Sequence, residues 1–181
     1  MSRSAFVRLL LTQLLLLSSS AQPAENHLHF QLISGVMLQP NSQYFHSTYG
    51  GAFTLSSPYA NLHATLSYIE RPKFSASGFS DQEAGVFLVL GREIPLKRNL
   101  LLSAAAGIGR QQGFLESPRL DLHRNYHLDG LSTLGELRYS FSPYTFSLIH
   151  QTFVGIDGHE QLRSYVAWPF NFFNLAIGFS L

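Results

Sequence analysis

The chain has 181 residues, a formal net charge of +1, and only 13% charged residues. Because an average soluble domain carries about 25% charged residues, an ordinary salt-rich surface is excluded. Lysine and arginine form no patch interleaved with aromatic residues, so nothing indicates a nucleic-acid partner. Aromatic residues reach 13%, while the mean hydropathy of +0.06 is too low for a bundle of membrane helices. This combination is typical of a barrel with one face toward lipid and a polar interior.

The chain contains no cysteine, which excludes disulfides, thiol catalysis and cysteine-based metal sites. Its eight histidines are scattered without the spacing of metal ligands. No glycine-rich phosphate loop is present. The sequence therefore predicts neither a metal nor a cofactor.

Residues 1–24 have the three parts of a secretory signal peptide. Arg3 and Arg8 precede an apolar run from Leu9 to Leu17, and small residues follow around Ala21. The alternative is a transmembrane anchor, but the run is far shorter than the roughly 20 residues that a spanning helix needs. We expect cleavage of this segment and a mature domain over 25–181.

The mature part consists of short segments in which apolar and polar residues alternate, as in strands with two different faces. In the first, Leu28, Phe30 and Leu32 oppose His27, His29 and Gln31. The predicted strands cover about 27–38, 49–56, 60–70, 83–92, 99–111, 127–141 and 144–156, with a last strand that ends at Leu181. The sequence therefore predicts an all-β fold, an eight-stranded antiparallel barrel of a bacterial outer membrane.

The predicted connections alternate between short and long. Short turns fall near residues 57, 96 and 143, and long ones near 43, 76, 118 and 162, including loops over 71–82 and 112–126. Outer-membrane barrels combine short periplasmic turns with long extracellular loops. A soluble β-sandwich, the alternative fold, has no reason to keep that alternation.

The last predicted strand reads NFFNLAIGFSL, with Phe173, Leu175, Ile177, Phe179 and Leu181 on one face. Apolar alternation up to the final residue resembles the signal for insertion into the outer membrane. The barrel-assembly machinery is therefore an expected partner.

A barrel of eight strands has an interior just wide enough for its own side chains, so a wide pore is not expected. Glu136 and Arg138 fall on the inward face of their strand, where we predict an interior salt-bridge network.

On the predicted strand 144–156, His150 and Thr152 continue the face of Tyr144, Phe146 and Leu148. At ~3.4 Å per residue and a tilt near 40°, His150 lies roughly 18 Å above the turn, at the depth of the outer leaflet. An imidazole beside a hydroxyl can accept its proton and make it a nucleophile. The alternative interpretation is a histidine of the interfacial girdle beside an incidental threonine.

The stretch LGELRYSFSPYTFSLIHQTFVGI resembles the outer-membrane lipid A 3-O-deacylases, and the similarity extends over roughly 99–181. In that family a strand after a tight turn carries His-x-Ser-Asn, then glycine and an apolar residue. The corresponding positions hold His150, Thr152, Phe153, Gly155 and Ile156. The resemblance implies hydrolysis of an ester-linked acyl chain of lipid A, without a metal, by a Ser-His-acid triad facing lipid.

Two positions depart from that pattern, because Thr152 replaces the serine and Phe153 replaces the asparagine. The candidates for the third catalytic residue are Glu160, which follows in sequence, and Asn171, which lies outward on the last strand. The expected substrate and partner is lipopolysaccharide with its lipid A. The alternative function is a non-enzymatic barrel with a structural or surface-binding role, and a small-solute channel is a third possibility.

Overall fold

The structure is a computed structural model that describes residues 27–38, 45–57, 61–76, 79–118, 121–158 and 169–180. The expected signal peptide at 1–24 lies outside the described residues, as does Glu160. Within the described ranges, no helix combines the length and apolar character needed to cross a membrane.

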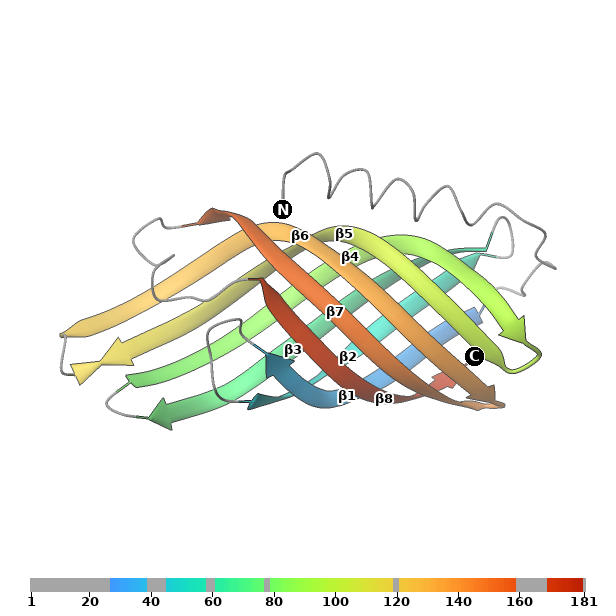
Figure 1. The fold of residues 1–181 in the computed structure, drawn as a ribbon, viewed down its shortest axis with the longest axis horizontal. Coiled ribbons are helices and arrows are strands. Elements are labelled where there is room, and N and C mark those ends of the chain that lie inside the picture. Colours follow the sequence, from blue (N-terminus) through green and yellow to red (C-terminus); the bar gives the residue numbers. More distant parts are fainter. Residues whose placement is uncertain are drawn as a thin grey trace.

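Eight antiparallel strands form one closed barrel (Figure 1). Each strand pairs with its neighbour in sequence, and β1 closes the barrel against β8. The strands are β1 (His27–Leu38), β2 (Phe45–Ser57), β3 (Leu62–Ala76), β4 (Phe79–Lys97), β5 (Leu100–Ser117), β6 (Leu122–Phe141), β7 (Tyr144–Gly158) and β8 (Phe170–Ser180). The predicted fold class is confirmed.

The four central strands are longer than predicted. The segments 71–82 and 112–126, expected to be long loops, are mostly strand, because β3 continues to Ala76 and β6 begins at Leu122. That expectation was wrong for a physical reason. Backbone hydrogen bonds hold a hairpin together whatever its hydropathy, and above the membrane both of its faces tolerate polar side chains. In Figure 1 these two hairpins project beyond the other strands at the left end.

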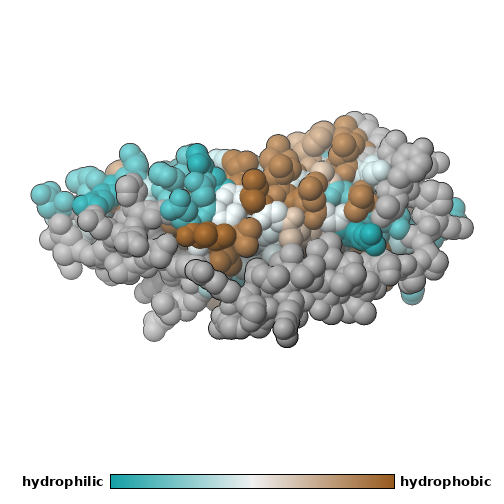
Figure 2. Space-filling model, turned by 90° about the horizontal axis from the view of Figure 1, so that it is seen from above, coloured by the Kyte–Doolittle hydropathy of each residue, from teal (hydrophilic) through white to brown (hydrophobic). Residues whose placement is uncertain are grey.

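The outer wall carries a band of exposed apolar side chains. Figure 2 shows them gathered over the middle of the wall, with hydrophilic residues toward the end that carries the long hairpins. Leu32, Leu90 and Leu175 are each more than 60% exposed. The band also includes Phe30, Phe53, Leu55, Leu66, Leu88, Ile108, Leu148 and Ile177. Soluble monomers rarely expose such a continuous apolar surface, so this wall fits lipid rather than water.

A layer of apolar side chains closes the middle of the interior. Phe87 contacts Phe153 and Phe172, with ring centroids 5.4 and 5.9 Å away. Gly85 and Gly109 leave the space that the Phe87 ring fills, since a Cβ at either position would lie within 2.5 Å of it. The described interior is therefore packed rather than open, as expected for eight strands.

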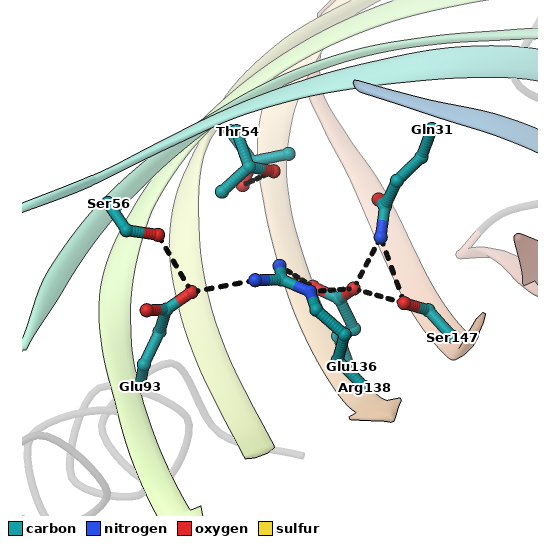
Figure 3. A network of polar contacts seen from close by, with 8 residues as sticks. Gln31, Thr54, Ser56, Glu93, Glu136, Arg138 and Ser147 are labelled. Atoms are coloured by element: carbon teal, nitrogen blue, oxygen red, sulfur yellow. Dashed lines mark hydrogen bonds and ion pairs between the residues drawn. The ribbon is translucent and has the colours of Figure 1, made fainter. Parts of the chain in front are cut away.

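A polar network lies on the periplasmic side of this layer (Figure 3). The Arg138 guanidinium donates to both oxygens of Glu136, at 2.9 and 2.7 Å, and to Glu93 at 3.0 Å. Gln31 and Ser147 donate to the same Glu136 oxygen at 2.8 and 2.6 Å. The predicted interior salt bridge between Glu136 and Arg138 is confirmed.

A second network lies on the extracellular side, above the apolar band. Arg71 binds Asp81 at 2.7 Å and Glu83 at 3.3 Å, and Gln111 donates to Glu83 at 3.0 Å. Tyr126 also donates to Glu83. Burial raises the pKa of Glu83, while Arg71 opposes that shift. Burial, and after it the neighbouring Glu83, raises the pKa of Tyr126. These contacts connect β3, β4, β5 and β6 beyond the membrane.

Candidate functional site

The outer wall around β7 and β8 holds the polar residues that the sequence singled out. β7 alternates as predicted, since His150 is exposed and Thr152 half-buried, whereas Ile149, Gln151 and Phe153 are buried inside. The pairing of β7 with β8 sets Thr152 opposite Asn171 and His150 opposite Phe173. Three of the four predicted site residues therefore lie together on the lipid-facing wall.

The hydroxyl of Thr152 lies between an amide and an imidazole. Its Oγ1 donates to Oδ1 of Asn171 at 2.9 Å, and it lies 3.5 Å from Nε2 of His150. The His150 ring stacks on Phe173, with centroids 4.5 Å apart and planes 20° from parallel. Stacking fixes the plane of the imidazole, and the amide oxygen of Asn171 accepts the hydrogen bond from the Thr152 hydroxyl.

This arrangement differs from an activated nucleophile in one respect. Activation requires the hydroxyl to donate to the imidazole, so that the base can remove the proton. Here the shorter hydrogen bond directs the proton of Thr152 to Asn171. Asn171 thus contacts the hydroxyl and not the imidazole that it was expected to orient. The contacts satisfy polar groups within an apolar wall, where an unpaired hydroxyl would cost free energy.

Among the residues that the structure describes, the strand neighbours of His150 on its own face include no acid. Gly135 of β6 pairs with it on one side and Phe173 on the other. Glu136 follows Gly135 in sequence, but it points inward and binds Arg138. A Cβ at Gly135 would meet no atom within 4 Å, so the wall is open beside the imidazole.

A second polar site on the outer wall was missed from the sequence. Arg110 of β5 and Asp129 of β6 form a two-point ion pair, with N–O distances of 2.7 and 2.8 Å. Arg110 follows the outward Ile108 by two residues and Asp129 precedes the outward Leu131 by two, and that alternation could have revealed them. The hydrogen bond from Arg110 holds the pKa of Asp129 below its ordinary value.

Neither site resembles a metal centre. Among the described residues, no group of three or more histidine, aspartate or glutamate side chains is placed to hold a metal ion.

No family model and no curated protein matches this sequence. Solved structures match the whole barrel. The N-terminal β-barrel domain of Pseudomonas aeruginosa OprF has a TM-score of 0.64 at 13% identity, covering 87% of this chain and 98% of that one. Ail, the attachment invasion locus protein of Yersinia pestis, has a TM-score of 0.61 at 9% identity, covering 87% and 100%. Neisserial surface protein A has a TM-score of 0.61 at 6% identity, covering 86% and 96%.

These similarities show the fold. Closure of eight antiparallel strands leaves no unpaired edge in lipid, and the exposed apolar band matches the hydrocarbon layer. The chain is therefore a small β-barrel that spans an outer membrane.

Proposed function

We propose that this protein is a non-enzymatic outer-membrane barrel with a structural and surface-binding role. The observation that carries the proposal is the division of the molecule into a filled barrel and a stiff projecting rim. The rim consists of β3–β6 beyond the apolar band. Residues 1–24 act in this proposal as the export signal.

The rim is held in shape by ion pairs between its strands. Lys73 of β3 lies 3.7 Å from Glu116 of β5, and Arg110 binds Asp129 across β5 and β6. Together with the buried contacts of Arg71 and the continuous pairing of β3–β6, these pairs make the rim a hydrogen-bonded sheet rather than a set of adaptable loops. A rigid surface binds with a smaller loss of conformational entropy.

One of the similar solved structures supports a surface-binding role. Ail has been crystallised in complex with the heparin analogue sucrose octasulfate, and that structure has a TM-score of 0.60 at 8% identity to this chain. By analogy, the projecting rim is the part of this chain that would bind a saccharide outside the cell.

A second candidate function is hydrolysis of an ester-linked acyl chain of lipopolysaccharide. The observation in its favour is the grouping of His150, Thr152 and Asn171 on the wall that faces the outer leaflet. In this mechanism His150 is the base and Thr152 the nucleophile, with Glu160 or Asn171 orienting the imidazole. The direction of the Thr152 hydrogen bond favours the first proposal.

Complementation of cells that lack the protein separates the two candidates. One variant shortens the two rim hairpins with tight turns, and the other is His150→Ala. We expect the shortened barrel to lose protection against SDS and hydrophobic dyes, while His150→Ala protects like the wild type. Mass spectrometry of lipid A is the second measurement. Removal of an acyl chain by the wild type but not by His150→Ala would refute the non-enzymatic role.

A further inference from the structure

We propose that the outer wall of β4–β6 binds one glycolipid, with an acyl chain in a groove at the membrane and a sugar headgroup in a pocket above it. This inference rests on the proposed surface-binding role and assigns it a site and a ligand class. The site is separate from His150 and Thr152.

The lower part is an apolar groove of about 640 Å³ on the lipid-facing wall. Strand register aligns Leu88, Ile108 and Leu131 side by side across β4, β5 and β6. Val86 and Ile156 complete the apolar lining. Arg110 lies ten residues above the start of β5, which corresponds to about 26 Å at a 40° tilt. The groove therefore opens into the outer leaflet.

Charged groups lie at the top of this groove. The next row of the ladder contains Arg110, Asp129 and Asp157, and all three line the groove. An irregularity in the pairing of β6 with β7 leaves Ile156 as an extra residue and sets Asp157 opposite Asp129. A lipid lies in this groove with its chain downward, because these groups lie where a headgroup meets water.

A second pocket of about 470 Å³ continues above the charged row on the same three strands. One row pairs Gln112 with His127, and the row above pairs Phe114 with Asn125. Gln82 of β4 lines the same pocket. Carboxamides both donate and accept hydrogen bonds, as sugar hydroxyls do, and an aromatic ring offers an apolar face. This composition suits a polyhydroxylated headgroup.

The order of the surfaces along the outer wall, from the membrane outward, determines which kind of ligand fits the site. Apolar, ionic and amide-lined surfaces follow one another along β5 as Ile108, Arg110 and Gln112. A choline phospholipid has no hydroxyl-rich group for the upper pocket, and a soluble sugar has no chain for the groove. On β2 and β3 the exposed outward positions include Tyr49 and Tyr68, aromatic side chains of the kind that form the girdle of outer-membrane barrels.

Competition between two lipids tests the inference. The barrel, purified from outer membranes, is placed in nanodiscs containing equal amounts of monoglucosyl diacylglycerol and phosphatidylcholine with identical acyl chains. Native mass spectrometry then measures which lipid stays bound. We expect the wild type to retain the glucosyl lipid about five-fold over phosphatidylcholine, which corresponds to about one net hydrogen bond.

Two variants address the two halves of the site. Replacing Gln112 and Asn125 together by alanine removes the headgroup contacts and should abolish the preference, while Leu131→Trp fills the groove and should reduce binding of either lipid. Tyr49→Phe and Leu175→Trp are matched controls on other strands and should behave like the wild type. Gel mobility with and without heating verifies that each variant folds.

Equal retention of both lipids by the wild type overturns the inference. So does a preference that survives loss of both amides, because the headgroup would then bind elsewhere. The cell-based protection assay judges the structural role independently, since it does not depend on which lipid is bound.

Discussion

Replacing Arg138 by methionine should destabilise the barrel strongly. The change leaves the carboxylates of Glu136 and Glu93, 2% and 5% exposed, without their shared cation. Adding about 1.5–3 kcal/mol for each of the three charge-assisted hydrogen bonds of Arg138 would overestimate the loss of unfolding free energy. Gln31 and Ser147 continue to donate to Glu136. A buried pair that loses one partner is destabilised by about 3–5 kcal/mol, and we expect a loss in that range.

Urea unfolding of the barrel in lipid vesicles measures this loss. With a slope of roughly 2 kcal/mol per M, a loss of ~4 kcal/mol lowers the midpoint by about 2 M. Combining Arg138→Met with Glu93→Gln and Glu136→Gln should recover most of the stability, because no unpaired charge then remains inside. Lys97→Gln, at an exposed position, is the control. A loss below about 1 kcal/mol for Arg138→Met alone would refute a dry, fully paired network.

Three further perturbations test other parts of the molecule. Phe87→Ala should lower the free energy of unfolding by about 3–5 kcal/mol, because it empties the middle of a packed interior; an unchanged urea midpoint would contradict the apolar layer. Thr152→Val should lower the same quantity by about 1 kcal/mol by removing the hydrogen bond to Asn171, while lipid A masses stay unchanged. Arg110→Gln should raise the pKa of Asp129 toward the ordinary aspartate value, as measured by NMR titration. Because that pKa is depressed in the folded barrel, the ion pair stabilises the fold above the ordinary aspartate pKa, and this contribution disappears as the pH falls.

The positions of the strands, and the face on which each side chain lies, could be predicted wherever one face of a strand meets lipid and the other meets the polar interior. The alternation through Tyr144, Phe146 and Leu148 predicted that His150 and Thr152 point outward, and the structure agrees. The predicted bounds of the first strand match β1. The hairpins above the membrane could not be predicted in this way, because their buried inner face carries polar residues such as Arg71 and Glu83, so the alternation of apolar and polar residues disappears there.

The contacts within the candidate site depended on register between strands. The sequence placed His150 and Thr152 two residues apart, but only the pairing of β7 with β8 set Asn171 opposite Thr152 and Phe173 opposite His150. That pairing directs the hydroxyl proton to an amide. No local pattern contains this information, since one residue of slippage would replace every neighbour.

The sequence by itself determined the barrel class, the outward and inward faces, and the interior position of Glu136 and Arg138, because these follow from period-two alternation between lipid and lumen. Tertiary structure alone decided which side chains meet. Closure of the sheet brought Gln31 of β1 to Glu136 of β6, and ladder register aligned Ile108 with Leu131 in one groove. The physical reason is that alternation is a property of one strand, whereas contacts depend on the offset between strands.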